Sequence, residues 1–329
     1  MPSLAFAKTK TRRHVAVCVA IPDVADLAAR LKPFEDVFDE IVVSSFSPIP
    51  GGKSRYTPDD HRRLVESCHA MAMSAVDCYG WRYTPECQAV LAAPAEIRRC
   101  IAHMVERCET SGSDGLVVDF EAWPPHTRFA FTDFIAQLSP ELHRRGKTLS
   151  VAAYPANTAQ RRERGQPFID VHSIAPLADR FHVMTYDQFC PPSPYIGPTS
   201  TTPWARDGMQ DMLTQAPGYK LLMGLPTYSV DWDVTDPTRS RQVNDAAHLE
   251  ACETISPIGR GWCYYWDVGL IRYVDSDQHI HLIYVSDARS TRSQLQNVDQ
   301  LDLAGIFFWV FNGREDPEIY RAVRSHFAR

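Results

Sequence analysis

The chain has 329 residues, of which 44% are hydrophobic, and its formal net charge at pH 7 is −6. This length is ample for a full core and allows two domains or one large barrel. The negative charge indicates neither a nucleic-acid partner nor an acidic membrane surface, and no apolar run reaches the length that spans a bilayer. Nucleic-acid binding and membrane insertion are therefore not expected.

The first 13 residues and the cysteines bear on the compartment. Residues 1–13 are poor in apolar side chains and end in a basic cluster, whereas a secretory signal places its basic residues before an apolar core. As written, the chain is therefore predicted to be cytoplasmic, with secretion the alternative if the sequence has been trimmed. Its nine cysteines are an odd number and form no CxxC pair, which indicates buried thiols in a reducing compartment.

Strand-like and helix-like segments alternate along the chain. The predicted strands are residues 14–20, 40–46, 69–76, 113–121, 148–154, 180–187, 220–227 and 304–311. The predicted helices are residues 26–34, a segment opened by Thr57 and Pro58, 94–109, a segment from about 127 to Gly146, 168–177, 203–215, 288–301 and 317–327. Eight strands, each followed by a helix, predict an α/β fold of the (β/α)8 or TIM barrel type.

Residues 229–286, between strand seven and its helix, do not fit this repeat. Two alternating runs, 262–274 and 279–285, flank the turn residues 275–277, which is typical of a β-hairpin. We therefore predict an N-terminal tail (1–13) and a barrel (14–328) with a small α+β hairpin insertion at 229–286. Insertions of this kind lie at the carboxyl face of a barrel, where they can wall a cleft.

The strand at 113–121 ends in two acids, Asp119 and Glu121. Because side chains alternate along a strand, Val117 and both acids share one face, and the other face carries Leu116, Val118 and Phe120. Active sites of (β/α)8 barrels form at the carboxyl ends of the strands. Two neighbouring acids in a dry site suit acid–base chemistry on a glycosidic bond, although this pattern alone favours a pair of solvated acids.

Neighbouring strands also end in polar and aromatic residues. They are Tyr154, Tyr186, Asp187, Tyr228 and Trp309. A ring of acids, tyrosines and a tryptophan around one mouth suits a sugar, because aromatic faces stack on pyranose rings and polar groups bind hydroxyls and amides. The sequence has no spacing typical of a metal site, and neither a metal nor another cofactor is expected.

Several of these segments resemble one enzyme family. Residues 114–121 (DGLVVDFE) resemble the DGxDxDxE signature of glycoside hydrolase family 18, with Asp114 and Gly115 as its structural residues. Residues 184–187 are similar to its Met-x-Tyr-Asp strand, 223–228 to its strand seven, and 305–309 to its strand eight with the tryptophan floor. Residues 228–232, 287–290, 303–305 and 315–317 resemble the branch of spore-cortex peptidoglycan hydrolases and chitinase-domain-like proteins.

The resemblance implies a retaining mechanism in which the substrate's own acetamido group is the nucleophile. Glu121 would be the general acid and base, Asp119 would orient the amide, and Tyr186 would donate a hydrogen bond to its oxygen. The substrate-binding candidates are Asp187, Trp309, Tyr228, Tyr154, Met184, Asp231 and Trp123. The implied partner is a carbohydrate polymer or oligosaccharide (chitin, peptidoglycan or an N-glycan core), and a monomer is favoured although the oligomeric state stays open.

Val117 stands where the family signature usually has its middle acid. Without that like charge the proton affinity of Asp119 changes, so we predict an altered acid limb of the pH profile. The change also leaves open a glycan-binding barrel without catalysis. Such proteins commonly lose the acid at the position of Glu121, which this chain keeps. A phosphate-using barrel enzyme is disfavoured, because no Gly-rich loop follows strand seven or eight.

Overall fold

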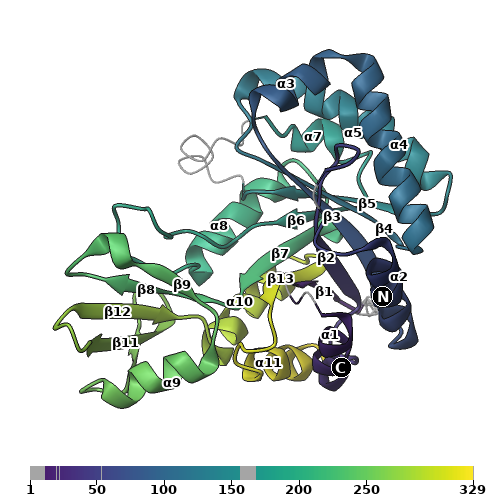
Figure 1. The fold of residues 1–329 in the computed structure, drawn as a ribbon. Helices are drawn as coiled ribbons and strands as arrows, with labels where there is room; N and C mark the ends of the chain where they lie inside the picture. Colours follow the sequence, from purple (N-terminus) through teal and green to yellow (C-terminus); the bar gives the residue numbers. More distant parts are fainter. Residues whose placement is uncertain (1–11, 20, 22, 53, 156–167, 329) are drawn as a thin grey trace, which may run out of the picture.

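The structure is a computed structural model that describes residues 12–19, 21, 23–52, 54–155 and 168–328. Most of the predicted tail, residues 1–11, lies outside the described residues. Parallel strands close into a barrel surrounded by helices, and a second sheet lies at one side of it (Figure 1). The predicted (β/α)8 barrel is therefore confirmed.

The barrel strands follow one another around the ring in chain order, and the ring closes where β1 pairs with β13. They are β1 (His14–Val19), β2 (Glu40–Phe46), β3 (Ser74–Arg82), β4 (Gly115–Glu121), β5 (Thr148–Ala153), β6 (Arg180–Val183), β7 (Leu221–Pro226) and β13 (Gly305–Phe311). Most of their side chains are apolar toward both the barrel interior and the helices, as expected for parallel strands that are covered on both faces.

The helices that cover the barrel are α1 (Val24–Leu31), α2 (Pro58–Ala70), α3 (Pro85–Ala92), α4 (Pro94–Ser111), α5 (Arg128–His143), α7 (Val171–Ile174), α8 (Thr202–Leu213), α10 (Ala288–Gln300) and α11 (Glu318–His326). Short 3-10 turns are found at Lys32–Phe34, Pro125–Thr127, Gly218–Lys220 and, in the insertion, Pro237–Arg239. The predicted start of α2 is confirmed, since the Thr57 side chain accepts a hydrogen bond from the Asp60 amide.

Three predicted boundaries were wrong. The third strand was expected at 69–76, but α2 continues to Ala70 and β3 occupies Ser74–Arg82, because the Ala- and Met-rich segment also favours a helix. Only Val171–Ile174 of the predicted helix 168–177 is helical. Strand β6 ends at Val183, so Asp187 lies in the segment that follows it, with a left-handed φ of 57°.

The alternation predicted for the acid-bearing strand is confirmed. Val117 packs inside the barrel with residues such as Cys18 and Phe307. The other face of β4 contributes to the core between barrel and helices, through Leu116, Val118 and Phe120. The two acids at the end of β4 therefore continue the inward-facing row.

The amino-terminal end of the barrel is closed by a buried ion cluster. Glu40 is 2% exposed, and its carboxylate lies 3.2 Å from Arg180 and 3.6 Å from each of His14 and His182. Burial alone would raise the pKa of Glu40, but the neighbouring imidazoles of His14 and His182 bring it well below its usual range. This cluster fixes the floor beneath the barrel interior.

The insertion is larger than the predicted hairpin. It forms a five-stranded antiparallel sheet in the order β10-β11-β12-β8-β9, with one helix packed against it. Its elements are β8 (Ser229–Asp233), β9 (Arg241–Val243), α9 (Ala246–Ile255), β10 (Arg260–Cys263), β11 (Val268–Val274) and β12 (Ile280–Val285). The predicted hairpin corresponds to β11 and β12, whereas Trp262 belongs to the separate strand β10.

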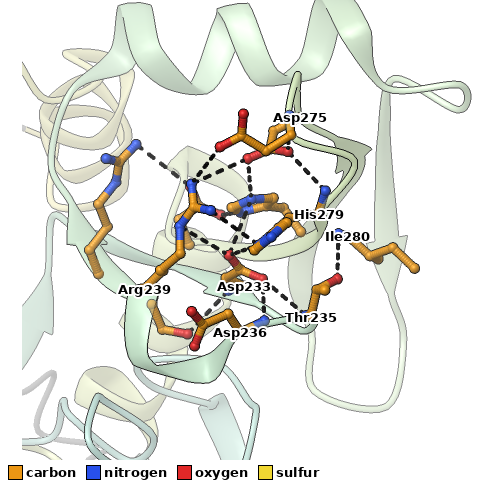
Figure 2. A network of polar contacts seen from close by, with 12 residues as sticks. Asp233, Thr235, Asp236, Arg239, Asp275, His279 and Ile280 are labelled. Atoms are coloured by element: carbon orange, nitrogen blue, oxygen red, sulfur yellow. Dashed lines mark hydrogen bonds and ion pairs between the residues drawn. The ribbon is translucent and has the colours of Figure 1, made fainter.

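A buried polar network joins the end of β8 to the start of β12 in this sheet. Asp233 is fully buried, and its carboxylate lies 2.7 Å from Nδ1 of His279 and 3.6 Å from Arg239. The same carboxylate accepts hydrogen bonds from the amides of Thr235 and Asp236 (Figure 2). A buried carboxylate with this many donors ties β8, β12 and the loops between them into one unit.

Gly115 offers a test of how tightly β4 and β5 pack. A Cβ atom at this position would lie 2.4 Å from the Thr148 carbonyl oxygen, whereas a Cβ at Gly80 would have its nearest neighbour at 3.9 Å. We expect Gly115→Ala to lower the free energy of unfolding by about 1–3 kcal/mol through overpacking. Gly80→Ala, its control in β3, should change it by less than about 1 kcal/mol. Equal denaturation midpoints for the two variants would contradict this packing.

Candidate active site

A cavity of about 1260 Å³ lies over the carboxyl ends of the barrel strands. Strand β4 contributes Val117, Asp119 and Glu121 to its wall. Of the other predicted site residues, Tyr154, Met184, Tyr186, Asp187 and Trp309 also line it. The strand ends thus bring acids and aromatic rings from β4, β5, β6 and β13 to one cavity.

The proton affinity of both acids is raised. Burial raises the pKa of Asp119 well above its usual range, and the nearby charge of Glu121 raises it further. Burial likewise raises the pKa of Glu121, against the opposing charge of Arg82. A carboxyl with a raised pKa keeps its proton near neutral pH, so this pair can supply a general acid there.

One oxygen of Asp119 has no partner within the described part of the chain. Its Oδ1 atom is buried and accepts no hydrogen bond there. A buried acceptor without a donor is costly. A substrate N–H or hydroxyl that enters the cavity could satisfy it.

Tyr186 and Trp309 form the aromatic part of the cavity. Their rings are nearly parallel, at 17°, with centroids 6.5 Å apart. Tyr186 is 5% exposed, and burial raises the pKa of its hydroxyl well above the usual value, so the hydroxyl stays protonated and can donate. Trp309 is half-buried, which leaves part of its ring open to a ligand.

Asp187 is held from two directions. The Tyr228 hydroxyl donates a hydrogen bond to its Oδ1 atom, and Nε2 of Gln242, from the insertion strand β9, lies 3.4 Å from the same oxygen. Tyr228 itself is buried and outside the cavity wall. Tyr228 therefore positions Asp187, and the insertion contributes to the site through Gln242.

Besides Tyr228, two more predicted substrate-binding residues lie outside the cavity wall. Trp123 is fully buried, its indole N–H donates to the Trp81 carbonyl at 2.7 Å, and its ring stacks on Phe120. Asp231 is 1% exposed in the inner strand β8, bonded to Tyr273 and His281. Both side chains are used for packing within the fold and cannot reach a ligand in the cavity.

The two structural motif residues lie at the opposite end of β4 from the acids. The Asp114 carboxylate accepts a hydrogen bond from the Ala75 amide and lies 2.8 Å from His69. Gly115 allows β4 to approach Thr148 closely. Both residues therefore support the strand and have no contact with the cavity.

The sequence-based prediction missed several cavity residues. Arg82 ends β3 opposite Glu121, but the misplaced third strand concealed it. Gln242 comes from the insertion, and Phe189 and Tyr195 come from the loop after β6, where strand periodicity gives no signal. One signal could have revealed Arg82, because it is a charged residue at the carboxyl end of strand β3.

Arg82 is expected to tune the acid. Its Nε atom lies 3.8 Å from Oε2 of Glu121, and its charge lowers the pKa of Glu121. In Arg82→Gln that pKa should rise, so the alkaline limb of the pH–activity profile should move to higher pH. Arg82→Lys keeps the charge and should leave the limb in place. A limb that moves equally in both variants, or moves to lower pH, would contradict this role for the charge.

No group of three or more His, Cys, Asp or Glu side chains is arranged to hold a metal in the part of the chain that the structure describes. Nor is any helix within the described ranges both long and apolar enough to cross a membrane. Three cysteines, Cys18, Cys78 and Cys190, lie in the cavity wall. Burial raises the pKa of the Cys18 thiol to about 12, so it is not a ready nucleophile.

A family model and two curated relatives match a large part of the chain. The model of the family described as glycosyl hydrolases family 18 matches residues 78–313. The "Uncharacterized glycosylase YvbX" of Bacillus subtilis (strain 168) is 26% identical over 220 residues, covering 64% of this chain and 60% of that protein. The "Cortical fragment-lytic enzyme" of the same organism is 25% identical over 217 residues, covering 64% of this chain and 49% of that protein. The chain thus spans about half the length of the curated relatives it matches.

A solved structure shows the same fold. The chitinase from Chromobacterium violaceum ATCC 12472 superposes with a TM-score of 0.84, covering 96% of this chain and 99% of that one. At 20% identity this likeness concerns the fold alone. Because the family model covers most of the chain, the protein belongs to glycosyl hydrolases family 18.

Proposed function

We propose that the chain is a glycosidase that cleaves β-linked glycans containing N-acetylglucosamine, with Glu121 as general acid and base. The observation that carries this proposal is the convergence of Asp119, Glu121 and Tyr186 on one cavity. Burial raises the pKa of Glu121, which favours the protonated form that a general acid needs. The names of two similar proteins, a chitinase and a cortical fragment-lytic enzyme, support chitin oligomers or peptidoglycan as the substrate class.

In the proposed first step, Glu121 transfers its proton to the glycosidic oxygen and the bond from that oxygen to the anomeric carbon breaks. The carbonyl oxygen of the substrate's own acetamido group forms the new bond to this carbon, giving an oxazolinium ion. With the proton of the acid pair on Glu121, Asp119 is a carboxylate, and its unpartnered Oδ1 atom would accept the amide N–H and stabilise the developing positive charge. The Tyr186 hydroxyl would donate to the acetamido oxygen and fix its direction of attack.

In the second step, a water molecule attacks the anomeric carbon and Glu121 takes the proton from it. The bond to the acetamido oxygen breaks, which restores the N-acetyl group and retains the configuration at the anomeric carbon. The half-buried ring of Trp309 would support the reacting sugar throughout. The two steps leave Glu121 protonated again, so the cycle balances without a cofactor.

A glycan-binding protein without turnover is the second candidate. Val117 favours it, because this residue stands in the cavity wall where the family signature usually has an acid. Wild-type protein incubated with fluorogenic N-acetylglucosamine oligomers and with peptidoglycan tests both candidates, with products identified by mass. Release of N-acetylglucosamine-terminated fragments supports the hydrolase. Glycan binding without any fragment overturns it in favour of the second candidate.

A further inference from the structure

The turn between β10 and β11 exposes two neighbouring tyrosines. Tyr264 is 83% exposed and Tyr265 is 84% exposed. A single exposed aromatic side chain is ordinary, but a contiguous group of exposed aromatic side chains can mark a binding site. This turn plays no part in the site described above.

Ring contacts connect the turn to the catalytic cavity. The centroid of Trp266 lies 5.6 Å from that of Tyr265 and 5.9 Å from that of Phe189. Phe189 lines the cavity, as does Tyr195, which is 70% exposed. Ring contacts through Trp266 therefore link Tyr265 in the turn to Phe189 in the cavity wall.

The turn is held in place from both sides. Within it, the Asp267 amide donates a hydrogen bond of 2.8 Å to the Cys263 carbonyl, where β10 and β11 pair. Toward the barrel, the Thr202 hydroxyl at the start of α8 lies 3.4 Å from the Asp267 carboxylate. Trp266 also packs edge-on against Tyr284 of β12, at 5.0 Å. A surface fixed in this way loses little conformational entropy when it binds a ligand.

We propose that Tyr264, Tyr265 and Trp266, the aromatic platform, bind sugar units of a glycan polymer that extends beyond the catalytic cavity. Tyrosine suits this ligand because its ring face stacks on a pyranose ring while its hydroxyl bonds sugar hydroxyls. Continuity with the cavity selects the same polymer over an unrelated partner. The inference rests on the proposed function for the identity of the ligand.

The platform predicts a difference between long and short substrates. We expect Tyr264→Ala/Tyr265→Ala to lower kcat/KM on a soluble N-acetylglucosamine polymer about tenfold. On a fluorogenic trimer, which the cavity alone can hold, the change should stay below about twofold. The matched control is Phe129→Ala/Tyr219→Ala, which removes aromatic rings that are 84% and 72% exposed and outside the cavity wall.

Binding is measured separately from turnover, by co-sedimentation of Glu121→Gln protein with insoluble chitin and with peptidoglycan, with and without the two tyrosine substitutions. Loss of sedimentation in the platform variant alone supports the platform, whether or not the wild type hydrolyses any substrate. A wild type that hydrolyses nothing would overturn only the proposed function. Unchanged sedimentation and polymer turnover in the platform variant overturn the platform. Equal losses on trimer and polymer, or in the control variant, also overturn it.

Discussion

Replacing Glu121 by Gln is expected to lower kcat/KM on N-acetylglucosamine oligomers by about 10²–10⁴-fold, the usual contribution of a general acid. The amide has the shape of the carboxyl group but cannot transfer a proton to the leaving oxygen. Glu121 is the candidate because its pKa is raised by burial at the end of β4, within the cavity wall. Steady-state rates of the two proteins on one fluorogenic oligomer give the ratio directly.

The same variant should remain folded and should still bind glycan. The Glu121 side chain is 29% exposed, and its ion pair is with Arg82, whose side chain is 82% exposed. An exposed pair of this kind contributes at most about 1 kcal/mol to stability. The melting temperature should therefore stay close to that of the wild type. A variant that keeps more than half of the wild-type rate would show that the acid lies elsewhere.

Replacing Trp123 by Ala is expected to lower the free energy of unfolding by about 3–5 kcal/mol, the range for truncating a buried tryptophan. Its ring is fully buried, with its centroid 5.1 Å from that of Phe120 and 6.1 Å from that of Phe168. The substitution also removes the hydrogen bond to the Trp81 carbonyl. Denaturant unfolding measures the loss.

Trp309→Ala is the matched control, since it removes the same side chain at a half-buried position in the cavity wall. We expect a smaller loss of stability here, together with a larger loss of kcat/KM. Trp123→Ala should retain the rate per folded molecule, because Trp123 does not contact the cavity. If Trp123→Ala has the melting temperature of the wild type and loses substrate binding, Trp123 is a substrate-binding residue and its assignment to the core is wrong.

The barrel and the acid-bearing strand could be predicted because their signals are local. Apolar runs at regular spacing mark the strands, and alternation along β4 determines which side chains face inward. The prediction of the third strand was wrong because helix α2 ends on residues that fit a strand equally well. That one-element error moved Arg82 from the cavity wall into an unassigned loop.

The positions of the other site residues depend on tertiary packing, which the sequence pattern does not reveal. Trp123 follows one strand-like run and Trp309 lies near the end of another, and nothing local distinguishes the buried ring from the one in the cavity. Asp231 was selected from a motif, yet in the folded chain it bonds Tyr273 and His281 within the insertion sheet. Gln242 reaches Asp187 only because β9 lies next to the segment that follows β6. Such contacts depend on the arrangement of the insertion, which periodicity does not encode.

The most direct test of the mechanism varies the substrate's acetamido group. Fluorogenic N-acetylglucosamine substrates carrying zero, one, two or three fluorines on the acetyl methyl differ chiefly in how readily the carbonyl oxygen attacks the anomeric carbon. Fluorine withdraws electrons from that oxygen, so kcat should fall steeply and in order along the series. A rate that is independent of fluorine number would show that the acetamido oxygen is not the nucleophile, and would contradict the roles proposed for Asp119 and Tyr186.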